Sequence, residues 1–239
     1  MLATTLLAHA ALLARLTAPY PFAVGETLEY EAKLGVIPIG TARMTVNPMT
    51  RERGAEAFVF AATGAGRPMG IRVGADLTSY VGARGFNSLR FHRKLYQGGS
   101  VDEAQFQIVP DSSRYREDGV PHDWAAPRDP LDELAFLYYL RTAPLKVGAT
   151  YQIPRYFKTG YNPIQVRVLG RVEWQLPGGR TVPAFNLEIT SRNLLMNVTM
   201  TDDARRLPVE LDLPLPFGRV TLELTSASGG QAVGRSGGQ

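Results

Sequence analysis

Histidine is the side chain best suited to acid–base catalysis near neutral pH, and the chain has three, at His9, His92 and His122. Cysteine is absent. This excludes a cysteine nucleophile, a disulfide framework, a thiolate zinc site, an iron–sulfur cluster and a cysteine-linked lipid anchor. A hydrolase built on this chain would therefore depend on His92 or His122. With so few candidate ligands we expect no metal centre and no cofactor.

The surroundings of these two histidines favour structural roles. His92 lies in the alternating segment Leu89–Leu95 and shares a face with Lys94, which is typical of a solvated strand. His122 stands next to Asp123 in a loop rich in turn-forming residues, and a turn histidine is the favoured interpretation. Catalysis by either histidine is therefore the least favoured of three functional hypotheses.

Two other motifs attract notice but have simple structural explanations. The glycine-rich segment Gly64–Gly70 departs from the dinucleotide-binding spacing and contains Pro68, so it predicts a loop. The acidic pair Asp202-Asp203 precedes Arg205-Arg206. Because adjacent carboxylates point in different directions, this pair predicts an Asx-type turn held by arginine rather than an acid–base dyad.

Alternation of apolar and polar residues dominates the segments that would position these groups. In Thr27–Lys33, the residues Leu28, Tyr30 and Ala32 share one face and charged residues occupy the other, which predicts a half-buried strand. The short turns between such segments favour antiparallel pairing, in about ten or eleven strands. The same pattern predicts strands at Thr41–Val46, Phe58–Ala62, Leu89–Leu95, Ala104–Ile108, Tyr151–Phe157, Ile164–Leu176, Leu194–Met200, Pro208–Leu213 and Arg219–Thr225.

The longest alternating segment is Ile164–Leu176, where Gly170 predicts a bulge or bend. The turn at 177–180 then leads into a partner strand and predicts a hairpin. The residues expected to point inward from this hairpin are Ile164, Val166, Val168, Val172, Trp174, Leu176, Phe185, Leu187 and Ile189.

One segment, Asp129–Arg141, predicts a helix, with Asp129 as N-cap, Pro130 at the first helical position and Arg141 in the last turn. Its interior is apolar on all sides, so protein must surround it. In a chain built mainly of strands, a strongly curved antiparallel sheet that forms a half-open barrel around the helix would do this. We therefore predict a mainly-β fold with one apolar helix at about 129–141.

Such a fold leaves either a filled core or an apolar cavity beside the helix. The residues predicted to line a cavity are Leu134, Leu137, Tyr138, Tyr30 and Trp174. The leading hypothesis is a non-enzymatic protein that binds an acyl chain, a lipid or a lipoprotein segment between sheet and helix. The alternative is a packed β scaffold that acts through contacts with an envelope protein partner.

The two ends of the chain differ in composition from the middle. Residues 2–16 are rich in alanine and leucine and have the length of a signal-peptide core, so we expect a signal peptide at 1–19 and export to the periplasm or beyond. Residues 20–225 would form a single domain, and no later segment is long enough for a transmembrane span. Residues 226–239 are rich in glycine and serine, which predicts a flexible tail.

The formal net charge of +4 is mild. Basic residues recur singly, as at Arg43, Arg167 and Arg171, rather than in one stripe or patch. Nucleic-acid-binding proteins usually concentrate their positive charge, so we expect no nucleic-acid partner.

Five segments together are typical of one known family: Pro21–Tyr30, Ile37–Gly40, Asp129–Arg141, Thr201–Val209 and Leu215–Gly218. Through them the chain resembles, over residues 20–225, the bacterial exported domain-of-unknown-function family 3108. The resemblance implies export and an architecture similar to the half-open barrels of periplasmic lipoprotein carriers, but no catalytic residue.

Overall fold

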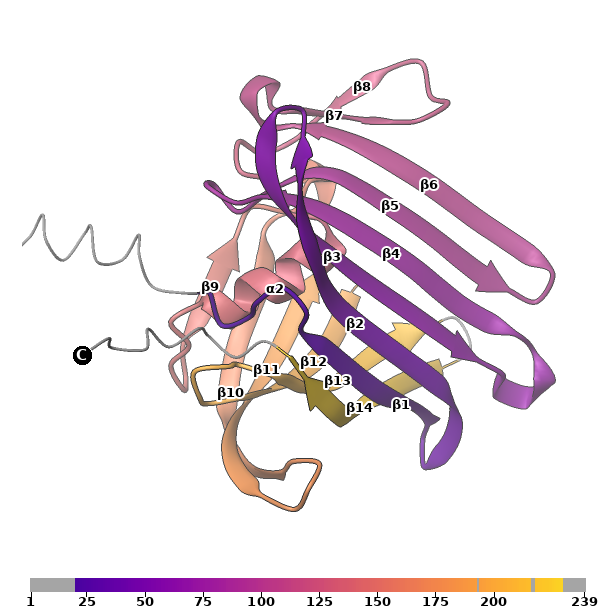
Figure 1. Cartoon of the computed structure of the whole chain (residues 1–239), viewed down its shortest axis with the longest axis vertical. Helices are drawn as coiled ribbons and strands as arrows, with labels where there is room; N and C mark the ends of the chain where they lie inside the picture. Colours follow the sequence, from indigo (N-terminus) through magenta and orange to yellow (C-terminus); the bar gives the residue numbers. More distant parts are fainter. Residues whose placement is uncertain (1–19, 193, 216–217, 230–239) are drawn as a thin grey trace, which may run out of the picture.

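A single antiparallel sheet contains the strands of this protein (Figure 1). The computed structural model describes residues 20–192, 194–215 and 218–229, and these residues form fourteen strands. The first eight are β1 (Thr27–Leu34), β2 (Ile37–Glu52), β3 (Ala55–Gly66), β4 (Val73–Gly82), β5 (Asn87–Gln97), β6 (Ser100–Val109), β7 (Arg114–Glu117) and β8 (Asp123–Ala125). The other six are β9 (Thr150–Ile153), β10 (Ile164–Gln175), β11 (Thr181–Ser191), β12 (Leu194–Thr201), β13 (Pro208–Leu215) and β14 (Gly218–Ser228). The described helices are α2 (Glu133–Thr142) and the 3-10 helices η1 (Pro68–Gly70), η2 (Pro110–Ser112) and η3 (Thr159–Tyr161).

The strand order is two meanders joined side by side. Strands β1 to β8 follow one another to one edge, strands β14 to β9 follow one another to the other edge, and β1 pairs with β14 in the middle. Strands β8 and β9 are the two edges and do not pair, so the sheet is not closed. The antiparallel pairing agrees with the short turns of the sequence.

The core lies on the sheet face that α2 contacts. Leu28 and Tyr30 of β1 are buried, as their alternation predicts. One apolar cluster contains residues of β1 to β4 in the first meander, of β9 to β14 in the second, and of α2. The two meanders therefore share one core.

Helix α2 begins four residues after the predicted N-cap. The cap is Asp132 and not Asp129, because the Asp132 Oδ1 atom accepts the backbone N–H groups of Leu134 and Ala135 at 3.0 and 2.9 Å. Leu131 instead forms an isolated parallel bridge with Tyr156, which holds the segment before Asp132 outside the helix. The predicted roles of Asp129 and Pro130 are thus wrong, whereas the apolar helix itself is confirmed.

The number of strands differs from the ten or eleven predicted. The alternation in β4 holds only from Val73 to Leu77 and breaks at Ser79, and β7 and β8 are too short to show a period. The strand predicted at 151–157 ends at Ile153. Strand β14 continues to Ser228 through pairing with β1, so residues 226–228 of the predicted tail belong to the sheet. Residues 1–19 and 230–239, and with them the predicted signal peptide, lie outside the described part of the chain.

The bulge predicted at Gly170 is confirmed, because the register of β10 against β11 shifts between Val168 and Gly170. Past this shift the inward pattern of β10 is lost. Val172 is 39% exposed, which corrects its predicted place in the core. Among the described residues, no helix is long and apolar enough to span a bilayer.

Candidate functional site

The five residues predicted to line a cavity divide into two groups. Tyr30, Leu134 and Tyr138 are buried in the core. The Tyr138 ring stacks on Phe60 with 3.8 Å between ring centroids, and the Tyr30 hydroxyl donates to the Pro208 carbonyl at 2.9 Å. These three side chains are held by packing.

Leu137 and Trp174 form the second group. Both are only partly buried and pack against the outside of the core cluster. The predicted set therefore does not converge on one space, although all five belong to or contact the same cluster.

A buried ion pair lies at the end of α2. The Arg141 guanidinium donates to both carboxylate oxygens of Glu26 at 2.6 and 3.0 Å, and neither side chain is exposed. Arg141 also donates to the backbone carbonyls of Pro21 and Arg205. The nearby Tyr138 hydroxyl is buried without a hydrogen-bond partner, and burial raises the pKa of Tyr138. This cluster ties the segment before β1 to the helix.

The apolar face that carries α2 extends beyond the helix. Six side chains on this face are only partly buried while packing against the core cluster. The pairing Met44↔Ala62, Ala62↔Leu77 sets residues of β2, β3 and β4 in one row. We call this set the core-face patch; it comprises Ala42, Ala62, Leu77, Met196, Leu213 and Leu222.

Two cations lie beyond Leu77, the member of the core-face patch that also packs against a second apolar cluster, which contains Phe106. Arg93 of β5 is the direct register partner of Leu77, and its guanidinium lies 3.2 Å from the Asp102 carboxylate. The Lys158 Nζ atom lies 4.4 Å from the centroid of the Phe106 ring, and within the described residues no carboxylate oxygen is within 4.0 Å of it. Burial is the main cause that lowers the pKa of Lys158, and Arg93 lowers it further, while the more distant carboxylates of Glu133, Glu117 and Asp102 act in the opposite direction. A partly buried ammonium without a carboxylate partner suits an anionic group of a ligand.

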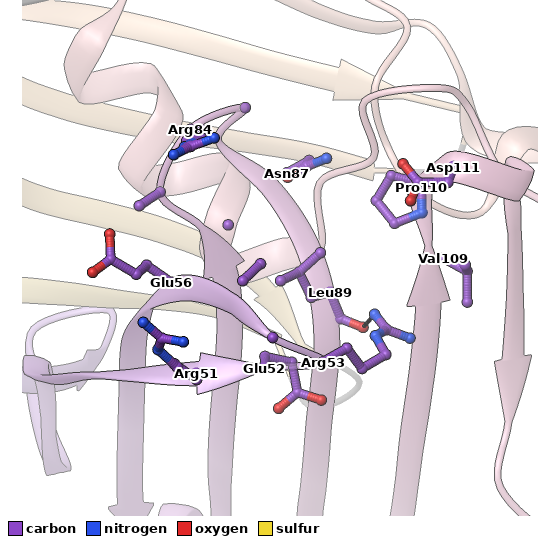
Figure 2. Close-up of a pocket in the computed structure, with 15 residues that line it drawn as sticks. Arg51, Glu52, Arg53, Glu56, Arg84, Asn87, Leu89, Val109, Pro110 and Asp111 are labelled. Carbon is purple, nitrogen blue, oxygen red and sulfur yellow. Dashed lines mark hydrogen bonds between the residues drawn. The ribbon is translucent and has the colours of Figure 1, made fainter.

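A cavity of about 720 Å³ opens at the end of the sheet where β2 turns into β3 (Figure 2). Charged side chains of both signs line it, and none of its lining residues comes from α2. The Arg53 guanidinium donates to the Leu89 carbonyl at 2.6 Å and to the Ile108 carbonyl, which anchors the β2–β3 turn to β5 and β6. The charged lining residues are Arg51, Glu52, Arg53, Glu56, Arg84 and Asp111.

A second cavity, of about 450 Å³, crosses β1 to β4 and β14. Polar residues such as Thr41, Thr63 and Asp76 line it, and Tyr30 is the one predicted site residue among its lining residues. No sequence signal pointed to either cavity, because their linings come from turns and strands that are distant in the chain.

His92 and His122 are not among the lining residues of either cavity. His92 Nε2 is 2.9 Å from Glu103 Oε1, and Lys94 Nζ is 2.9 Å from Glu103 Oε2. This is a cross-strand charge network on a partly exposed face. The His122 ring lies 4.1 Å from the Trp124 ring. Catalysis by either histidine stays a prediction.

The predicted Asx turn at 202–206 is confirmed. Asp203 Oδ1 accepts the backbone N–H groups of Arg205 and Arg206 at 3.0 and 3.1 Å, and Asp202 pairs with Arg171 and Arg206. In the described part of the chain, no group of three or more histidine, aspartate and glutamate side chains is arranged to hold a metal ion.

In the part of the chain that the structure describes, these features define an open, mainly-β protein whose helix α2 packs into the core on one face of the sheet. The chain belongs to the family described as "Protein of unknown function (DUF3108)", whose model matches residues 29–225. This confirms the resemblance found in the sequence. No curated protein matches the chain.

A similar solved structure is the crystal structure of a beta-barrel-like protein of domain of unknown function DUF1849 from Brucella abortus. The TM-score is 0.55 at 8% sequence identity, and the match covers 86% of this chain and 98% of that chain. At this identity the likeness concerns the fold alone, and it supports a barrel-like arrangement of the sheet.

Proposed function

We propose that this protein is a non-enzymatic carrier that binds an amphipathic ligand with an acyl chain. In this proposal the chain of the ligand lies on the core-face patch beside α2, and its anionic end lies at Lys158 and Arg93. The observation that carries the proposal is the continuation of the apolar, helix-bearing face into a partly exposed patch that ends at an ammonium group without a carboxylate partner.

The burial of α2 supports this arrangement. Leu134 and Tyr138 share one face of the helix and Phe136 lies on the opposite face, yet all three are buried. We infer that the sheet curves strongly around α2, so that the core-face patch becomes a trough rather than a flat surface. A trough would shield an acyl chain from water on several sides.

The energetics are adequate for a carrier. Each buried methylene contributes about 0.8 kcal/mol, so about eight buried methylenes would contribute about 6 kcal/mol before the costs of immobilisation. One charge-assisted hydrogen bond to the anionic end would add about 1.5–3 kcal/mol. The gross sum of about 8–9 kcal/mol makes micromolar affinity an upper bound, and the cost of immobilisation weakens binding from there, which suits reversible loading.

The site proposed for the acyl chain of the ligand can be tested with two neighbouring alanines that lie on opposite faces of β3. Ala62→Phe would fill the core-face patch, and we expect it to lower uptake of a fluorescent sixteen-carbon fatty acid about tenfold or more. Ala61→Phe is the matched control, because Ala61 is equally partly buried but faces away from the patch. Equal uptake by the two variants, or no uptake by the native chain, would reject the site.

The test of the anionic end uses Lys158. We expect Lys158→Met to weaken binding of the fatty acid about tenfold while leaving binding of its methyl ester unchanged. Lys146→Met serves as the control, because Lys146 is exposed and distant in sequence from the patch residues. A similar loss for acid and ester would show that Lys158 acts only through packing.

The alternative is a packed scaffold that acts through a protein partner, and the close packing of Tyr30, Leu134 and Tyr138 favours it. Native mass spectrometry of protein purified from its host separates the two functions. A co-purifying lipid is the result expected for the carrier. A chain that carries no lipid and takes up no fatty acid would favour the scaffold.

We further propose that the carrier works outside the cytoplasm, in the periplasm or beyond. The leader-like composition of residues 1–19 supports this. Fractionation of the host followed by N-terminal sequencing should find a mature chain that begins near residue 20. An intact Met1 in the cytosol would reject export.

A further inference from the structure

One end of the sheet concentrates exposed apolar side chains. The turns β1–β2, β3–β4, β5–β6, β11–β12 and β13–β14 all lie at this end, and three of them are visible at the lower right of Figure 1. Each of the five turns carries at least one large apolar residue that is exposed. We call this set the apolar rim; it comprises Val36, Ile37, Met69, Ile71, Val101, Leu194, Leu195 and Leu215.

The opposite end of the sheet shows the contrast. Its turns β2–β3, β4–β5, β10–β11 and β12–β13 carry no exposed large apolar side chain, and its turn β6–β7 carries one, Val109, which is 37% exposed. If turns in this protein simply tolerated exposed apolar residues, such residues would be equally frequent in the turns at both ends of the sheet. The difference therefore points to a role for the end that carries the rim.

In the two most exposed members of the apolar rim, the conformation of the turn backbone directs the side chain into solvent. Val36 is 90% exposed in the tight β1–β2 turn next to Gly35, which has a positive φ of 62°. Met69 is 79% exposed and itself adopts a positive φ of 48°, a conformation that costs a non-glycine residue energy. The chain thus maintains a strained turn that presents an apolar side chain to solvent.

Positive charge accompanies the rim. Arg67 and Arg72 flank Met69 in the β3–β4 connection, and both are exposed. Within the described residues neither has a carboxylate oxygen within 4.0 Å. The acidic Asp102 and Asp212 near this end are already paired with Arg93 and Arg219.

We propose that the apolar rim docks on a membrane surface that contains anionic lipids. Paired strands set successive turns about 10 Å apart, so the rim is a row of separate apolar tips rather than one flat patch. A fluid lipid interface can close around each tip, and its anionic headgroups would pair with Arg67 and Arg72. This inference stands on the rim and does not require that the core-face patch binds a ligand.

The experiment is co-flotation of the full chain with vesicles of phosphatidylglycerol and phosphatidylethanolamine, compared with vesicles of phosphatidylcholine. Residues 1–19 stay identical in every variant, so that their contribution cancels. We expect the native chain to float with the anionic vesicles. Val36→Ser/Met69→Ser should lower its partition coefficient about tenfold or more, because it removes two inserted apolar side chains.

Arg67→Gln/Arg72→Gln should lower binding to anionic vesicles about fivefold per arginine and leave binding to phosphatidylcholine unchanged. The matched controls are Val24→Ser/Val147→Ser and Arg128→Gln/Arg180→Gln, which change exposed residues away from the rim. Both controls should bind as the native chain does. All variants alter exposed side chains, so their melting temperatures should stay close to that of the native chain.

Three results would overturn the membrane assignment. The first is the absence of the native chain from the floated anionic vesicles at every protein concentration tested. The rim variants and their controls could bind equally, which would assign binding to another segment. A dimer that Val36→Ser/Met69→Ser dissociates, without vesicle binding, would identify a second copy of the chain as the occupant of the rim.

Discussion

Removing the Arg141 side chain from its buried ion pair with Glu26 should cause a large loss of stability. Arg141→Met would leave the Glu26 carboxylate buried with only Arg205 nearby, at 3.7 Å. We expect a loss of about 3–5 kcal/mol in the free energy of unfolding, measured by urea denaturation. Arg43→Met removes a surface pair with Glu29 and should cost less than about 1 kcal/mol. Similar losses for the two variants would contradict a special role for the buried pair.

The N-cap Asp132 makes stability depend on pH. Both Ser79 and Ser88 donate to its Oδ2 atom at 2.6 Å, yet burial raises its pKa from 3.8 to about 6. Because the folded state binds this proton more tightly than the unfolded state, the Asp132 contribution is most favourable below pH 4 and declines as the pH rises through 6. The decline should be about 3 kcal/mol.

Asp132→Asn isolates this contribution. The amide keeps a capping oxygen but does not titrate, so the difference in unfolding free energy between native chain and variant should change mainly between pH 4 and 6. Asp129→Asn is the control, since Asp129 is exposed and should leave the pH profile unchanged. A constant difference over this range would show that Asp132 does not titrate there.

A substitution in helix α2 can show whether the space beside the helix is filled by packed side chains or is an open cavity. Leu134 is only 4% exposed, so Leu134→Trp should introduce strain of about 1–3 kcal/mol or more. The melting temperature should fall by about 2–4 °C for each kcal/mol lost. Leu137→Trp on the same helix is the control, because Leu137 is partly exposed and a larger ring there can extend toward solvent. An unchanged melting temperature for Leu134→Trp would indicate an unfilled space beside the helix, as the sequence suggested.

The joining of both meanders through β1 and β14 predicts how the protein unfolds. The pairing brings together residues about 190 positions apart, as in the hydrogen bond from Lys33 to Glu223, and a single apolar cluster includes both meanders. Calorimetry should therefore show one transition with equal calorimetric and van't Hoff enthalpies. Two separate transitions would show that the meanders have independent cores.

Several features of this fold follow from short stretches of sequence. The alternation in Thr27–Leu34, the bulge at Gly170 and the apolar interior of α2 depend on neighbours two to four residues apart. Such periodicities indicate which side of an element is buried, whatever the element packs against. This is why a mainly-β protein with one apolar helix was predictable, and why the family resemblance agreed with it.

Other features depend on contacts between distant segments. Asp129 and Asp132 are equally good caps by residue type, and the bridge between Leu131 and Tyr156 decides between them. Lys158 lies near Arg93 only because β5 and the segment before β10 meet on the same face. The apolar rim likewise exists because the strand order brings five separate turns to one end. Local patterns carry no information on strand order, so the candidate site and the rim emerged from the folded chain.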